Sequence, residues 1–180
     1  MATFTQIGSA VTVGAGGTTS VTFSSIPNTY TDLMIYMSIR SSRTGVNFDS
    51  IGYRFNGSTS GYQTRYIYAD GSTVGSYSDT TFSPAGQVWG RFDGGAINAG
   101  NTTSNTFTSI ALYIPNYAGN TNKSFSSEIV SENNATAAIA QVTAGLWSNT
   151  AAITEIAFRD NNLGNIAQHS TFYLYGVSNA

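Results

Sequence analysis

Residues 33–39, Leu-Met-Ile-Tyr-Met-Ser-Ile, decide the fold class of this chain. Side chains along an extended strand point alternately to opposite faces, so residues two positions apart share a face. One face of this stretch is wholly apolar and carries Leu33, Ile35, Met37 and Ile39. The other face carries Met34 and Tyr36, which indicates that it is partly covered as well. The pattern predicts a β-strand whose apolar face packs in a core.

The same alternation recurs along the rest of the chain. We expect about ten short strands, over residues 21–24, 33–39, 51–56, 66–69, 87–92, 107–114, 123–131, 136–147, 153–159 and 171–177. Turn-forming pairs such as Asn56-Gly57 and Asp70-Gly71 end several of them. Residues 71–86 lack a clear pattern, and residues 96–105 are expected to form a polar loop. The pattern predicts an all-β protein, an antiparallel β-sandwich of jelly-roll-like type.

One domain suits a chain of 180 residues. We expect residues 19–180 to form a single β-sandwich domain. Residues 1–18 are expected to form a flexible N-terminal arm, because the glycine-rich stretch near its end, Gly14-Ala-Gly-Gly17, would detach it from the domain.

Composition excludes several classes of function. Charged residues make up only 9% of the chain, and seven basic residues oppose nine acidic ones. A nucleic-acid binder that neutralises phosphates needs a basic surface, so we expect no nucleic-acid partner. The absence of cysteine removes disulfides and thiolate zinc sites, and favours synthesis in a reducing cytoplasm. No apolar stretch approaches the ~20 residues that span a bilayer, so we expect no membrane partner.

Candidate catalytic groups are few and scattered. His169 is the only histidine, and a lone histidine is most simply a surface residue. The carboxylates considered as pairs are Asp93, Glu128, Glu132, Glu155 and Asp160. Glu128 and Glu132 would lie ~13 Å apart on one strand face, beyond the ~9.5 Å that glycosidases use. Asp160-Asn-Asn162 is the best calcium candidate, but a turn explains it equally well. We therefore expect no enzyme, no metal site and no cofactor.

Aromatic residues give the one positive indication of a binding surface. Tyr, Trp and Arg are enriched in the centres of protein interfaces. The candidate interface residues are Tyr62, Tyr66, Tyr68, Tyr77, Trp89 and Arg91. Because Tyr66 and Tyr68 share one strand face, we expect Ile67 to face the core and the tyrosines to face a partner or water. The same rings could instead stack on sugars, or simply pack inside the sandwich.

Several stretches carry a resemblance to a known protein family. They are Ser25–Leu33, Tyr53–Ser58, Leu112–Lys123, Glu132–Thr136, Gly145–Ile153 and Phe172–Gly176. Together they resemble small virion structural proteins of tailed bacteriophages, a family frequent in phages of cyanobacteria and other aquatic bacteria. The likeness covers nearly the whole chain after residue ~18, and the family has no catalytic motif to transfer.

The resemblance implies a role in the virion, after synthesis in the host cytoplasm. The first expectation is a capsid decoration (cement) protein that binds the major capsid protein or other virion proteins and stabilises the outer head surface, as a homotrimer. The alternative is a tail-fibre or receptor-binding module that recognises host-surface glycans through its tyrosines. A glycan-degrading enzyme is the third possibility, and the dispersed acids make it the weakest.

Overall fold

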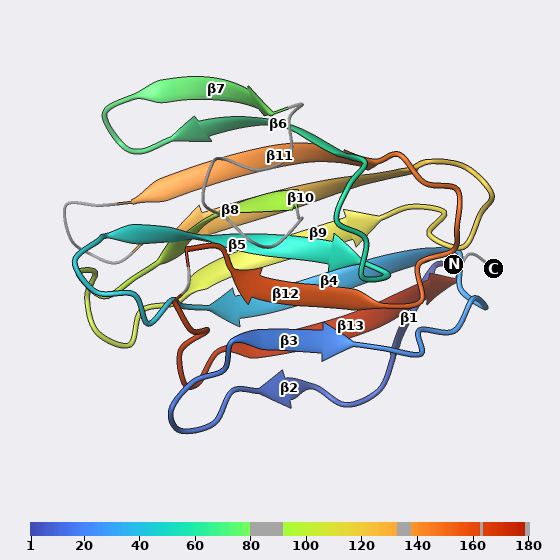
Figure 1. Cartoon of the computed structure of the whole chain (residues 1–180), viewed down its shortest axis with the longest axis horizontal. Helices are drawn as coiled ribbons and strands as arrows, with labels where there is room; N and C mark the ends of the chain where they lie inside the picture. Colours follow the sequence, from blue (N-terminus) through green and yellow to red (C-terminus); the bar gives the residue numbers. More distant parts are fainter. Residues whose placement is uncertain (80–91, 133–137, 163, 179–180) are drawn as a thin grey trace.

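Two antiparallel sheets, stacked face to face, make up the protein (Figure 1). The computed structural model describes residues 1–79, 92–132, 138–162 and 164–178. These residues contain strands and no helix. The prediction of an all-β, antiparallel β-sandwich is confirmed.

The larger sheet has nine strands. They are β1 (Thr3–Gln6), β2 (Val11–Thr12), β4 (Asp32–Ile39), β6 (Tyr62–Ala69), β7 (Val74–Asp79), β9 (Thr108–Ile114), β10 (Lys123–Ser131), β11 (Ile139–Trp147) and β13 (Thr171–Ser178). The strand order is β1-β13-β4-β9-β10-β11-β6-β7, with β2 also paired to β13. The β6–β7 hairpin therefore forms one edge of this sheet (Figure 1).

The smaller sheet has four strands in the order β3-β12-β5-β8. They are β3 (Ser20–Phe23), β12 (Ile156–Asp160), β5 (Phe48–Phe55) and β8 (Phe92–Asn98). The chain passes between the two layers repeatedly, from β3 to β4, from β4 to β5 and from β5 to β6. These crossings join the two sheets into one sandwich.

The core lies between the layers and is largely aliphatic and aromatic. Leu33, Ile35 and Ile39 on β4 are fully buried, as the sequence predicts. Phe158 of the smaller sheet packs against Phe172 of the larger one, with ring centroids 5.4 Å apart. The smaller sheet covers one face of the larger sheet, and no described part of the chain covers the other face. We call this the outer face.

The structure corrects two strand boundaries. Residues 74–79 form β7, although the Ser- and Gly-rich sequence gives no alternating pattern there. Their backbone pairs with β6, so hydrogen bonding defines this strand rather than burial. Strand β8 runs to Asn98, three residues into the expected polar loop, because Ile97 and Asn98 are fully buried. Most of the strand expected over 87–92 lies outside the described residues.

The N-terminal segment lies along the edge of the larger sheet. Thr3–Gln6 pairs with the end of β13, and Val11–Thr12 pairs with its beginning. Beyond them, His169 N donates a hydrogen bond to Val13 O at 2.9 Å. The residues set apart from the sequence as an arm are thus hydrogen-bonded to the sandwich over much of their length.

Candidate functional site

Tyr62 lies in the core rather than on a surface. It is 4% exposed, and its ring stacks on Trp147 at a centroid distance of 6.2 Å. Its hydroxyl accepts a hydrogen bond from Phe55 N at 2.9 Å. Burial raises the pKa of Tyr62 to about 12. Of the candidate interface residues, Tyr62 therefore offers almost no area to a partner in the folded chain.

The orientation predicted for β6 was wrong. Tyr66 and Tyr68 share the inward face of this strand with buried Tyr62 and Thr64, whereas Ile67 points to the outer face and is 60% exposed. The two tyrosines are half-buried. The physical reason is register: the buried pair of Tyr62 and Trp147 fixes the parity of the whole strand.

Three tyrosines gather on the inward side of the β6–β7 hairpin. The Tyr66 ring lies 5.3 Å from that of Tyr77 and 6.1 Å from that of Tyr68. They line a cleft of about 280 Å³ together with Asp49 and Gln141. We call this the tyrosine cleft. The carboxylate of Asp49 is fully buried and the amide of Gln141 donates to Thr143, so the tyrosine rings are the groups that this cleft offers to a ligand. Ring faces of this kind suit a ligand with an apolar face, such as a sugar ring.

The other two candidate interface residues, Trp89 and Arg91, lie outside the described residues. The aromatic cluster seen in the sequence is thus divided. One member packs in the core, and three form the wall of a cleft.

A buried acidic pair, missed in the sequence, lies near the cleft. Asp49 on β5 and Asp160 on β12 are 5% and 1% exposed. The hydroxyl of Ser41 is hydrogen-bonded to Oδ2 of both carboxylates. Arg43 approaches Asp49 with Nη1 3.5 Å from Oδ1. Burial, followed by the charge of Asp49, raises the pKa of Asp160.

The geometry of this pair is consistent with the raised pKa of Asp160. A hydroxyl has one hydrogen to donate, so Ser41 cannot donate to both carboxylates at once. When Asp160 is protonated it donates to Ser41, and Ser41 donates to the ionised Asp49. The remaining oxygen of Asp160, Oδ1, accepts from the backbone N–H groups of Asn162 and Gly164. Asp160 ends β12, and Asn161 and Asn162 form the turn that follows it.

Other candidate chemical groups are dispersed. His169 is exposed at the start of the last strand, and Glu128 lies on the outer face. Among the described residues, no three His, Asp or Glu side chains come close enough to hold a metal ion. The acidic pair belongs to a hydrogen-bonded structural network, with its lone pairs directed at Ser41, Asn162 and backbone N–H groups.

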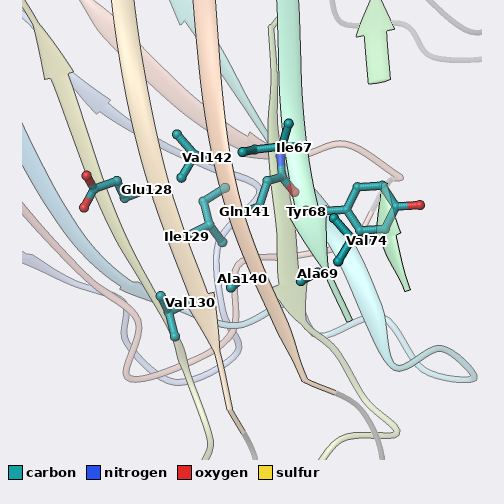
Figure 2. Close-up of a pocket in the computed structure, with 10 residues that line it drawn as sticks. All are labelled: Ile67, Tyr68, Ala69, Val74, Glu128, Ile129, Val130, Ala140, Gln141 and Val142. Carbon is teal, nitrogen blue, oxygen red and sulfur yellow. The ribbon is translucent and has the colours of Figure 1, made fainter. Parts of the chain in front are cut away.

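The outer face of the larger sheet is the broadest uncovered surface. Its edge nearest β7 is aliphatic: Ile67, Val130 and Val142 on adjacent strands are 60%, 54% and 51% exposed (Figure 2). Val74, on β7, is 84% exposed. Aliphatic side chains gathered in this way on an exposed sheet face indicate an interaction surface. The sequence signal was the alternation of β10, which places Val130 and the buried Ile129 on opposite faces of the sheet.

The other half of the outer face is aromatic. Tyr36 on β4 is 43% exposed, and its ring packs edge-on against Tyr175 of β13 at 6.1 Å. Tyr113 on β9 donates a hydrogen bond to Asp32 at 2.8 Å, which raises the pKa of Tyr113. Met34 lies between Tyr113 and Tyr175 in the register of the sheet. Tyrosine and methionine are residues that protein interfaces favour.

Comparison with known proteins gives no match: no family model, no curated protein and no solved structure shows significant similarity to the chain. Within the described ranges, no helix is long and apolar enough to cross a membrane.

Proposed function

We propose that this chain is a structural protein of a phage virion, and that it decorates the outside of the head by binding the shell through its outer face. The observation that carries the proposal is the uncovered outer face, with its aromatic half around Tyr36. The resemblance of the sequence to small virion proteins supplies the identity of the assembly. A surface of this kind acts by binding a second protein surface.

The dimensions of the outer face support a macromolecular partner. Strands lie about 4.8 Å apart and residues about 3.3 Å apart. The eight strands along the sheet, at about six residues each, give a face of about 38 Å by 20 Å. The whole face is comparable in area with the ~800 Å² that each partner buries in a standard protein–protein interface, so its aromatic half alone makes a small site that repetition on a shell reinforces.

The low charge of this surface supports the same proposal. Burying a charged group without a partner is costly, whereas burying tyrosine and aliphatic area is favourable. On a shell that repeats one site many times, a ligand that bridges neighbouring subunits stabilises the assembled state by mass action. A modest affinity at each site is then sufficient.

Cosedimentation with purified heads that lack this chain tests the proposal. We expect the wild-type protein to bind the heads and to raise their melting temperature. Tyr36→Asp should abolish both effects, because it places a charge in the aromatic half of the outer face. Thr22→Asp is the matched control, since Thr22 is exposed on a strand of the smaller sheet. Absence of wild-type binding, or equal loss with both variants, would refute the proposal.

The position of this chain on the virion is tested separately, by counting its copies. Quantitative mass spectrometry of intact particles gives the number of copies of the chain. Hundreds of copies would support head decoration, whereas a few dozen or fewer would support a place in the tail.

A second candidate function is recognition of a host-surface glycan, and the tyrosine cleft favours it. Tyr66, Tyr68 and Tyr77 line the cleft with ring faces on which a sugar can stack. Binding to a glycan array should be lost in Tyr66→Ala and Tyr68→Ala but kept in Tyr36→Ala, which changes the opposite side of the sheet. Tyr62→Ala is unsuitable, because Tyr62 is part of the core.

A further inference from the structure

We propose that the aliphatic half of the outer face, formed by β10, β11, β6 and β7, binds the same surface of a second copy of this chain around a twofold axis. The proposal concerns a different half of the outer face from the one that binds the shell in the proposed function. The sequence led us to expect a homotrimer. A single flat face favours a pair instead, because one copy is enough to cover it.

The apolar side chains form a continuous ridge because the strands bring them into register. Val142 on β11 lies directly opposite Ile67 on β6. Both side chains are more than half exposed. Adding Ala140, Val130 and Val74, which lie next to them in the register, extends the same apolar surface toward the end of the sheet. Val130 and Val74 are also more than half exposed in the folded chain.

The pair of Ile67 and Val142 is the crest of this ridge, and a hollow lies on each side of the pair. One hollow of about 340 Å³ is bordered by Ala140, Val130 and Glu128 (Figure 2). The other, of about 630 Å³, is bordered by Arg65 and Ala144. Ile67 and Val142 line both hollows. A ridge flanked by two hollows is complementary to a second copy of itself, because the ridge of each copy can enter a hollow of the other.

The two charged residues of this surface favour a second copy of the chain over the other partners that could cover an apolar surface. On the described parts of β6, β10 and β11, the outer face carries two charged residues, Arg65 and Glu128. They lie on opposite sides of β11, one beside each hollow. Both are exposed, and within the described residues neither forms an ion pair.

A twofold axis exchanges these two positions. The axis lies in the plane of the interface and crosses β11 between Val142 and Ala144. It places Arg65 over the partner's Glu128, and Glu128 over the partner's Arg65. Two ion pairs then flank a buried apolar centre, which is the arrangement of a polar rim around a hydrophobic core. A self-complementary patch of this kind defines an isologous dimer.

The size of the patch predicts a weak dimer. Four strands cover about 19 Å across the sheet, and about six residues cover 20 Å along it. The area is about half of what each partner buries in a standard interface. Association should therefore depend on concentration, with a dissociation constant in the micromolar range.

Sedimentation velocity of the full chain over a range of concentrations tests the proposal. We expect a monomer–dimer equilibrium for the wild-type protein. Val142→Asp and the milder Val142→Ser should weaken it, while Thr22→Asp, on the smaller sheet, should leave it unchanged. Circular dichroism establishes that each variant is folded. A monomer at all concentrations, a trimer, or full dimerisation of the folded Val142→Asp protein would overturn the proposal.

Charge reversal tests the twofold geometry itself. Arg65→Glu and Glu128→Arg should each weaken dimerisation about tenfold, because each places like charges opposite one another at both ends of the interface. The double variant should restore affinity to within about threefold of wild type. Failure of the double variant to recover would refute the proposed pairing. Cosedimentation of Val142→Ser with heads separates this outcome from the proposed function: shell binding can survive the loss of the dimer.

Discussion

Tyr62 and Trp147 lie opposite each other on β6 and β11, and their rings stack with an interplanar angle of 16°. This pair fixes which face of β6 is buried. All residues an even number of positions from Tyr62 turn toward the inside, so the tyrosines line a cleft. Ile67 turns outward, toward the proposed dimer surface. One buried aromatic contact thereby defines two candidate binding surfaces.

Replacing Trp147 should strongly destabilise the protein. Its side chain is 1% exposed and contacts the rings of both Tyr62 and Phe55. We expect Trp147→Ala to lower the free energy of unfolding by about 3–5 kcal/mol, as cavity-forming changes of this size do. Urea denaturation measures the loss. Phe4→Ala, at a residue that is 53% exposed, should cost less than about 1 kcal/mol; equal losses would contradict the assigned role of Trp147.

Much of the fold could be predicted because its signal is local. The alternation of Leu33 to Ile39 and of Ile110 to Ile114 gave both the strands and their buried faces. Strand β7 could not be predicted in this way, because its residues are exposed and only backbone pairing with β6 defines them. The orientation of Ile67 failed for a related reason. Hydrophobicity favoured an inward side chain, but the cross-strand partner of Tyr62 decided the register.

The chemical groups were harder to predict because strands distant in sequence bring them together. Asp49 and Asp160 belong to β5 and β12, which are neighbours only in the folded sheet. The sequence singled out Asp160 among scattered carboxylates, but nothing in it paired Asp160 with Asp49. The outer face had a visible signal with a different meaning: Met34 and Tyr36 on the second face of β4 predicted partial cover, whereas Tyr36 is 43% exposed and no described element covers that face.

Gly145 should not tolerate a side chain. It lies opposite Phe125 on β10, and a Cβ atom at this position would lie 2.1 Å from the Phe125 ring. The ring would have to leave its edge-on contact with Phe55. We expect Gly145→Ala to cost about 1–3 kcal/mol in thermal or urea denaturation. Gly14→Ala is the control, because nothing lies within 4 Å of its Cβ position. A neutral Gly145→Ala would show that the core can repack there.

Lys123 should stabilise the fold through its hydrogen bonds to three backbone carbonyls. Its ammonium group is buried and donates to the oxygens of Gly119, Thr121 and Thr150. Burial lowers the pKa of Lys123. We expect Lys123→Met to cost about 1–3 kcal/mol, because it leaves buried carbonyls without a donor. Gln63→Met, an exposed change on β6, should have almost no effect on the free energy of unfolding. A stable Lys123→Met protein would mean that water replaces the ammonium group.

The acidic pair should make stability depend on pH through Asp160. Burial raises the pKa of this residue in the folded state, so the folded chain binds a proton more tightly than the unfolded chain. The stabilising contribution is complete below the unfolded pKa of about 3.9. It is lost as the pH rises through the folded pKa. Asp160→Asn removes this dependence, because its amide can donate to Ser41 at every pH as the protonated acid does.

Urea denaturation between pH 2 and pH 8 measures this effect. Relative to Asp160→Asn, the wild-type protein should lose stability as the pH rises from about 3.9 through the folded pKa of Asp160, and change no further above it. Asp70→Asn is the informative control. Asp70 is exposed and accepts backbone hydrogen bonds from Thr73 and Ser72, which lower its pKa. Its contribution therefore has the opposite sign and is lost as the pH falls. If the curves of wild type and Asp160→Asn ran parallel, the proton shared through Ser41 would be ruled out.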